Sequence, residues 1–366
     1  MKQLHKIIAG IVLLLEFVGV PALAQEAASK DSINQKANEI DVKEIVFGHI
    51  GDSYEWHITD IGHTSISIPL PIIVYSANTG WHSFLSSKLE ENGATYEGFY
   101  IASSGTYEGK IVEKNAAGEE VRPFDISITK ITLSLFINSA ILLIIILSVA
   151  HWYRRREQGA LAPGGFVGFM EMFIMMVHDD VIKSCAGPNY RKFAPYLLTA
   201  FFFIFINNVM GLIPIFPGGA NVTGNIAITM VLALCTFLAV NLFGTRHYWK
   251  DIFWPDVPWW LKVPVPMMPF IEFFGVFTKP FALMIRLFAN MLSGHMAMLV
   301  LTCLIFISAS MGPAINTSLT VASVLFNVFM NILEVLVAFI QAYVFTMLSA
   351  VFIGLAQERK DEGIEA

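Results

Sequence analysis

Charged side chains are scarce in this chain of 366 residues, because Asp, Glu, Lys and Arg make up only 14% of it. An average soluble domain has roughly 25%. So few charges cannot cover the surface of a water-soluble protein of this length. Hydrophobic residues account for 55% of the chain, and phenylalanine alone contributes 30 residues. This composition is typical of a protein surrounded by lipid, and it nearly excludes a cytosolic enzyme.

Cysteine and nucleotide-binding motifs are also scarce. The three cysteines, Cys185, Cys235 and Cys303, lie far apart and mostly in apolar stretches, so they support neither a disulfide framework nor a zinc site. We interpret them as buried thiols. The chain contains no G-x-x-x-x-G-K-[ST] pattern, which would cradle nucleotide phosphates. We therefore expect no metal, no cofactor and no nucleotide site on this chain.

The few charges are unevenly placed. Residues 25–130 contain 16 acidic and 8 basic side chains, whereas residues 131–366 contain 12 acidic and 13 basic ones. The acidic first part is the polar region of the chain, and without a basic patch it offers no electrostatic footprint for nucleic acid. Its β-branched and aromatic stretches at residues 66–75 and 96–112 predict a few short strands. Its histidines are scattered among polar residues, which argues against a metal site.

The N-terminus has the pattern of a secretory signal peptide, residues 1–24. An apolar run at residues 7–20 follows two lysines, and Ala22 and Ala24 match an A-x-A cleavage site. The run is too short to cross about 30 Å of hydrocarbon as a helix. An uncleaved anchor is the alternative. In either case we expect residues 25–130 outside the cytoplasm.

Apolar stretches predict three ordinary membrane spans, at residues 131–150, 194–216 and 226–243. A basic cluster at residues 154–156 follows the first span, and Arg246 and Lys250 follow the third. The positive-inside rule places these basic residues in the cytoplasm. Between the first two spans, residues 167–183 predict an amphipathic helix. Residues 249–269, rich in tryptophan and proline, are expected to form a connector at the headgroup level.

Two longer apolar stretches follow, at residues 270–310 and 321–357. The first would be about 60 Å long as one helix, roughly twice the hydrocarbon thickness. No hydrophilic turn divides either stretch, so we predict a long, strongly tilted helical hairpin. The predicted fold is an all-α polytopic membrane protein with about five mature membrane helices and a small extracytoplasmic N-terminal region with some β. The charged tail, residues 358–366, is expected in the cytoplasm.

Four charged residues stand out within these apolar stretches. Between residues 263 and 357, Glu272, Lys279, Arg286 and Glu334 are the only Asp, Glu, Lys or Arg residues, and such groups in a bilayer are functional candidates by default. The first three are spaced by seven, so they lie along one helical stripe. An arginine does not deprotonate at biological pH. It can therefore hold a fixed positive field but cannot pass a proton on, which makes Arg286 a candidate gate.

His295 and Glu334 have the complementary property. Histidine titrates near neutrality, and burial raises the pKa of a carboxyl group toward the same range, so both are candidate proton relays. Gln341 lies seven residues after Glu334 and shares its helical face. The alternative for His295 and Glu334 is a structural pair that pins two helices together. The alternative for Glu272 and Lys279 is that they reach the membrane interface and have no further role.

Several motifs occur in order along the chain: Asn-Asn-Val-Met-Gly-Leu-Ile-Pro at 207–214, the stretch 221–227, Glu272, Thr-Lys-Pro at 278–280, Arg-Leu-Phe-Ala-Asn at 286–290, Gly294, Glu334 and Gln341. Together they closely resemble subunit a of F-type ATP synthases, over roughly residues 130–357. The signal pattern, the charge distribution and the apolar stretches divide the chain into a signal peptide at 1–24, an extracytoplasmic polar region at 25–130 and a membrane domain at 131–366. An insert near residues 76–122 exceeds the usual length of the family.

The resemblance implies a non-catalytic stator subunit in the inner (plasma) membrane of the cell. The signal pattern and the positive-inside rule predict that its mature N-terminus lies outside and its C-terminus in the cytoplasm. It implies a hairpin at about residues 270–357 that lies in lipid against a ring of c subunits, together with a b-subunit peripheral stalk and a soluble ATPase sector. The implied roles are a proton gate at Arg286 supported by Asn290, an external half-channel at Glu334, His295, Asn208 and Gln341, and a cytoplasmic half-channel at Glu272 and Lys279.

Two departures from the family pattern accompany the resemblance. Many bacterial members have Glu and then His at the paired relay positions, whereas this chain has His295 and then Glu334, an exchange that resembles the mitochondrial arrangement. Gly211 stands where an acidic residue often follows the Asn of the second span. Two other functions stay open from the residues themselves. A proton-coupled secondary transporter should show internal repeats, and a non-conducting membrane anchor should tolerate neutral residues at Arg286 and Glu334.

Overall fold

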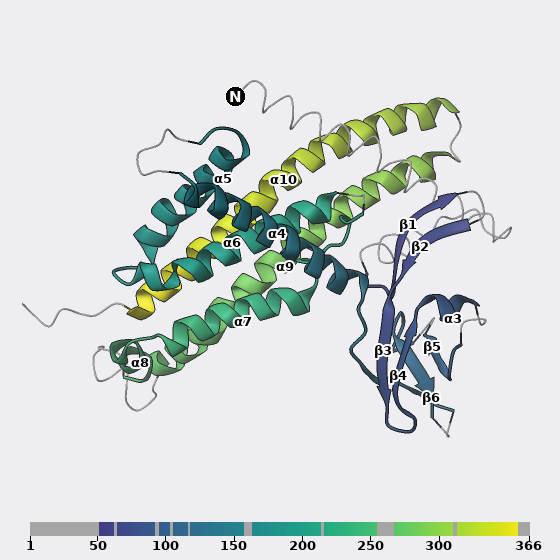
Figure 1. Cartoon of the computed structure of the whole chain (residues 1–366), viewed down its shortest axis with the longest axis horizontal. Helices are drawn as coiled ribbons and strands as arrows, with labels where there is room; N and C mark the ends of the chain where they lie inside the picture. The colour runs from purple at the N-terminus through teal and green to yellow at the C-terminus, as the bar shows by residue number, and fades with distance from the viewer. Residues whose placement is uncertain are drawn as a thin grey trace, which may run out of the picture. The chain divides into compact units, whose positions relative to one another are not determined.

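The computed structural model describes residues 51–357 apart from short internal gaps (Figure 1). The gaps are residues 62–63, 92–94, 103–104, 116–117, 157–162, 214–215, 255–266 and 310–312. The predicted signal peptide and the charged tail therefore lie outside the described residues, as does most of the predicted connector at 249–269. The contacts group the chain into two compact units, and we describe each unit by itself.

The predicted membrane helices are present. Four helices are long and apolar enough to cross a membrane: α4 (Lys130–Arg154), α6 (Tyr190–Leu212), α9 (Met267–Ala309) and α10 (Pro313–Gln357). The helix α7 (Ile226–Leu242) provides a fifth span if it is taken together with α8 (Arg246–Phe253), to which it is bent by 101°. The number of spans confirms the predicted fold class of a polytopic helical membrane protein.

The two C-terminal helices are the longest elements. α9 has 43 residues and α10 has 45, so each is about 65 Å long at 1.5 Å per residue. Neither is divided into two spans, although Pro280 lies inside α9. The two long, undivided helices confirm the predicted hairpin. A helix about twice as long as the hydrocarbon layer is thick can cross that layer once if it is strongly tilted.

One compact unit is formed by residues 138–209, 221–295 and 332–366, so it contains most of the spans and one half of each long helix. Its apolar core includes Leu197, Phe201, Leu287, Met291 and Phe345, all at most 3% exposed. The predicted amphipathic helix at 167–183 is α5 (Gly165–Met175), which continues directly as the π-helix η1 (Met176–Lys183).

The other unit is formed by residues 1–137, 210–220 and 296–331. Its β region consists of three small antiparallel sheets. The first sheet pairs β1 (Glu55–Ile61) with β2 (Thr64–Pro69). The second has the order β4 (Gly80–Leu85), β3 (Pro71–Ser76), β8 (Phe124–Asp125), and the third has the order β5 (Phe99–Ile101), β6 (Ile111–Lys114), β7 (Glu120–Val121). A short helix, α3, spans Ser87–Glu91. Alternate residues of β3 and β4 point into a core with Phe99 and Ile111, since Ile72, Val74 and Phe84 are buried.

The predicted strands at 66–75 and 96–112 correspond to parts of β2, β3, β5 and β6, but β1, β4 and the two-residue strands β7 and β8 escaped the prediction. The reason is clearest for β1 and β4. Both contain histidine, serine or charged residues between their apolar positions, which weakens a signal based on β-branched runs. The interpretation of all three cysteines as buried thiols was wrong. Cys303 is buried, whereas Cys235 is exposed on the outer surface of α7 and Cys185 is half-buried, because an apolar stretch in a membrane helix includes lipid-facing positions.

Candidate functional site

The two candidate relays meet in the structure. Nδ1 of His295 on α9 lies 3.0 Å from Oε1 of Glu334 on α10, and 3.0 Å from the carbonyl oxygen of Met291 one turn earlier. The Glu334 side chain is 4% exposed and that of His295 is 12% exposed. Apart from this ion-pair contact, neither carboxylate oxygen has a hydrogen-bond partner among the residues that the structure describes. A buried carboxyl group with a single titratable neighbour is equipped for proton exchange.

Gly294 permits this approach of the two helices. A Cβ atom added to Gly294 would lie 2.5 Å from Oε1 and 2.8 Å from Cδ of Glu334. Any larger residue would therefore push the carboxylate away from its position. The glycine is needed here for close packing and not for its backbone conformation, since it lies inside α9.

Arg286 faces away from the core of its unit. Its neighbours Leu283 and Leu287 are 2% and 1% exposed, whereas Arg286 itself lies on the exposed face of α9. Glu272 and Lys279 are exposed on the same helix, as the spacing by seven predicted. No ion pair joins Arg286 to a carboxylate in the described part of the chain. The guanidinium thus lies on an exposed face of α9 with no carboxylate partner among the described residues.

A second polar group surrounds Asn208 of α6. The Thr223 hydroxyl donates a hydrogen bond to Oδ1 of Asn208 at 2.6 Å, and Nδ2 of Asn208 donates to the carbonyl oxygen of Ala338 on α10 at 3.4 Å. Asn208 and Thr223 are fully buried. One turn of α10 separates Ala338 from Glu334. Asn208 is thus linked through α10 to the helical turn next to Glu334.

Three further buried amides, those of Asn221, Asn138 and Asn207, hold the spans of this unit together. Nδ2 of Asn221 donates to the carbonyl oxygen of Met291 at 3.5 Å, and its Oδ1 accepts from the backbone nitrogen of Gly224 at 2.8 Å. Nδ2 of Asn138 on α4 donates to Oδ1 of Asn207 on α6 at 3.0 Å. Such hydrogen bonds between spans are worth about 1 kcal/mol each, so these amides orient the helices that carry the candidate relays.

The remaining predicted residues lie on the same two long helices. Gln341 is 7% exposed and lies two turns after Glu334 on α10. Asn290 is half-buried on α9, one turn after Arg286. The structure thus brings His295, Glu334 and Asn208 together through packed helices, and it separates Arg286, which faces outward.

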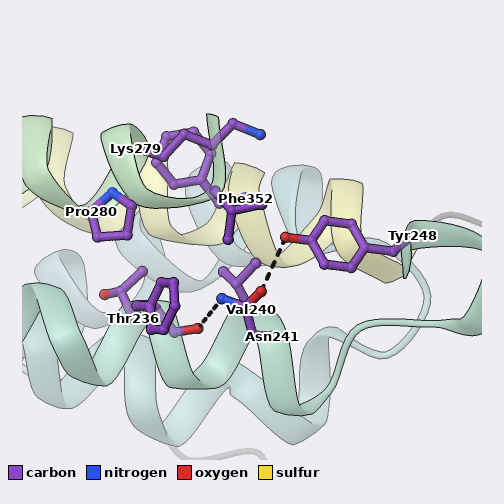
Figure 2. Close-up of a pocket in the computed structure, with 9 residues that line it drawn as sticks. Thr236, Val240, Asn241, Tyr248, Lys279, Pro280 and Phe352 are labelled. Atoms are coloured by element: carbon purple, nitrogen blue, oxygen red, sulfur yellow. Dashed lines mark hydrogen bonds between the residues drawn. The ribbon is translucent and has the colours of Figure 1, made fainter. Parts of the chain in front are cut away.

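A shallow pocket lies beside Lys279 (Figure 2). It is lined by Thr236, Phe237, Val240, Asn241, Tyr248, Val276, Lys279, Pro280 and Phe352. The Tyr248 hydroxyl donates to Oδ1 of Asn241 at 3.4 Å, and Nδ2 of Asn241 donates to the carbonyl oxygen of Phe237 at 2.8 Å. The Lys279 ammonium lies over the Phe352 ring, 5.7 Å from its centre, which is a cation–π contact. It forms no ion pair within the described residues.

Reasoning from the sequence missed four of these polar residues: Asn138, Thr223, Asn241 and Tyr248. Asn138 could have been found, because it is the only amide side chain in the span at 131–150. The other three lie near span ends, where polar residues are ordinary. The described residues contain no group of three or more His, Cys, Asp or Glu side chains that could hold a metal ion.

Comparisons with known proteins show the family to which the chain belongs. A family model described as "ATP synthase A chain" matches residues 135–354, and a model described as a domain of unknown function matches residues 45–127. The chain is similar to proteins named "ATP synthase subunit a" from Chlorobium phaeobacteroides, with 43% identity over 65% of this chain and 67% of the relative, and from Chloroherpeton thalassium, with 41% over 68% and 72%. A protein of the same name from Myxococcus xanthus is 40% identical over 63% of this chain and 73% of the relative. A buried carboxyl–imidazole pair, an outward-facing arginine and these matches lead to one conclusion: the chain belongs to the family of ATP synthase subunit a, the non-catalytic, proton-conducting membrane subunit of the F-type ATP synthase.

Proposed function

We propose that Arg286 is the electrostatic gate between two proton half-channels and faces an acidic residue on a ring of c subunits. The observation that carries this proposal is the exposed guanidinium on the outer face of α9, with no carboxylate partner among the described residues. A fixed cation in lipid needs an anion opposite it. A guanidinium favours the ionised form of a carboxyl group that passes it, and it blocks the direct passage of a proton.

The external half-channel is formed by Glu334, His295, Asn208 and Gln341. A proton from outside passes along this buried polar group, neutralises a ring carboxylate and is carried through almost a full rotation. The 3.0 Å contact of the Glu334 carboxylate with the His295 imidazole and the hydrogen bond of Asn208 to α10 support this route. Asn290, one turn after Arg286, supports the gate from the same helix.

The cytoplasmic half-channel is formed at Glu272 and Lys279. Arg286 promotes release of the proton there, because it stabilises the ionised ring carboxylate. The pocket next to Lys279 adds the polar atoms of Asn241 and Tyr248 to this exit (Figure 2). Each elementary charge that moves through 100 mV supplies about 2.3 kcal/mol, so several protons are needed for each ATP.

The chain lies in the inner (plasma) membrane, with residues 25–130 outside the cytoplasm and the C-terminus inside. The basic cluster at the end of α4 and the basic residues of α8 support this orientation. The partners are the c-subunit ring, the b-subunit peripheral stalk and the soluble ATPase sector, where ATP chemistry takes place. Membership of the family disfavours a secondary transporter and a passive anchor.

The test is Arg286→Ala in inverted membrane vesicles that contain the assembled complex. We expect ATP-driven proton pumping to be lost, while the amount of assembled complex stays unchanged. Arg154→Ala, which removes an exposed arginine at the end of α4, is the matched control and should pump normally. Retained pumping by Arg286→Ala would refute the gate.

A further inference from the structure

The sheet formed by β4, β3 and β8 has a face that no described residue covers. In register across the three strands lie Trp81, Tyr75 and Phe124, which are 62%, 41% and 64% exposed. The Tyr75 and Trp81 rings are 5.1 Å apart. Leu85 and Ile126 are exposed as well. With Ile73, these residues form what we call the aromatic face.

The aromatic face carries no charge, although it belongs to the most acidic part of the chain. Its outward positions are Pro71, Ile73 and Tyr75 on β3, Trp81, Ser83 and Leu85 on β4, and Phe124 and Ile126 at β8. Residues 25–130 contain 24 charged side chains, and none of those that the structure describes is among these outward positions. An uncharged surface that includes tryptophan and tyrosine is typical of the boundary between water and lipid.

This face is tied closely to the first residues of a membrane span. Ile126 and Ile128 donate backbone hydrogen bonds to Ile73 and Pro71, and the next bonds run from Lys130 to Ser53 and from Ile131 to Asp52, with lengths of 2.9–3.1 Å. The span α4 begins at Lys130. Five residues lie between Phe124 and Lys130, so even a fully extended chain would hold the two at most about 20 Å apart.

A second tie holds the same region at the end of another span. Trp56 of β1 is 3% exposed, and its ring lies 5.1 Å from that of Phe216, in an edge-on contact. Phe216 follows α6, which ends at Leu212. If α4 crosses the membrane in one direction and α6 crosses back, the start of α4 and the end of α6 lie on the same side. The β region is thus fastened to that side at two points.

We propose that the aromatic face rests in the lipid headgroup layer on the side of the membrane where α4 begins, with β3 and β4 lying flat along the surface. The occupant of this face is lipid and not another protein, because the hydrogen-bonded connector leaves the sheet too little length to move away from the bilayer. Burial of aromatic and aliphatic side chains drives the contact, since the face has no basic residues to attract anionic headgroups.

A spin label on the face tests this placement in the whole complex. The three native cysteines are replaced by alanine, Ser83→Cys is labelled with a nitroxide, and the complex is reconstituted into vesicles of phosphatidylcholine and phosphatidylglycerol. Ser83 is an exposed position between Trp81 and Leu85. Collisions of the nitroxide with oxygen, which concentrates in lipid, should exceed those with a water-soluble nickel chelate.

Val121→Cys is the matched control, because Val121 is 40% exposed on β7 of another sheet. A label there should favour the nickel chelate. Adding Trp81→Glu and Phe124→Glu to Ser83→Cys should reverse the preference of the Ser83 label. The proposal is overturned if the Ser83 label behaves like the Val121 label, if both reagents are excluded because a protein covers the face, or if the double substitution leaves the preference unchanged.

Discussion

Oε1 of Glu334 lies 2.5 Å from the position that a Cβ atom would take on Gly294. The carboxylate is therefore seated against the backbone of the neighbouring helix, next to His295. Even a methyl group added at Gly294 of α9 should therefore displace the carboxylate of this candidate proton relay.

Gly294→Ala should lower proton flow without preventing assembly. The added methyl group displaces the Glu334 carboxylate at a cost of about 1–3 kcal/mol, while alanine is the better helix residue by about 1 kcal/mol. The measurement is passive proton conductance of vesicles, normalised to the amount of subunit. Gly275→Ala on the same helix, where a Cβ meets no atom within 4 Å, should conduct normally. Equal conductance of both variants would contradict the relay.

Glu334→Gln should slow proton flow more than it harms assembly. The amide keeps the shape of the side chain but cannot exchange a proton at neutral pH. ATP-driven pumping and the yield of purified complex are measured on the same preparation. Equal losses of pumping and yield would favour the structural pair with His295, since a structural pair loses stability and function together.

Thr223→Val should weaken the polar group around Asn208. The valine leaves Oδ1 of Asn208, which now accepts the Thr223 hydroxyl at 2.6 Å, without that donor, at a cost of about 1–3 kcal/mol. We expect lower proton conductance and a lower unfolding temperature of the purified subunit. The control Thr223→Ser keeps the hydroxyl group and should conduct protons like the parent chain. If Thr223→Val conducts like the parent chain, Asn208 does not depend on this hydrogen bond.

Tyr54 should make the β region sensitive to alkaline pH. Burial raises the pKa of the Tyr54 phenol above its ordinary value, and the 2.5 Å hydrogen bond that the phenol donates to Asp125 is the second cause of this shift. Its stabilising contribution is fully present below the unfolded pKa of about 10 and is lost as pH rises through the raised value. The rate of limited proteolysis of the β region should therefore increase above pH 10.

Tyr54→Phe should remove this alkaline sensitivity and cost about 1 kcal/mol at neutral pH through the lost hydrogen bond. Tyr107→Phe is the control. Tyr107 is half-buried, and its backbone carbonyl accepts a hydrogen bond from the Lys110 backbone nitrogen, which the substitution keeps. An unchanged pH profile in Tyr54→Phe would assign the sensitivity to another group.

Much of the membrane domain could be predicted because lipid makes simple demands on a sequence. A span needs about 20 apolar residues, and the stretches that became α4, α6, α7, α9 and α10 meet this demand without reference to any neighbour. Charges inside such stretches are costly, so Arg286 and Glu334 stood out by themselves. The spacing by seven placed Glu272, Lys279 and Arg286 on one helical face, which the structure has on its exposed side.

The sequence by itself thus determined the spans, the long hairpin and the identity of the gate candidate, since helix periodicity and lipid solvation act locally. Only the tertiary structure decided that His295 and Glu334 touch, that Gly294 makes room for them, that Thr223 serves Asn208 and that an aromatic face stays open on the β region. These relationships depend on how helices and strands far apart in the chain pack together, and packing is set by side-chain shape across elements, which no local pattern records.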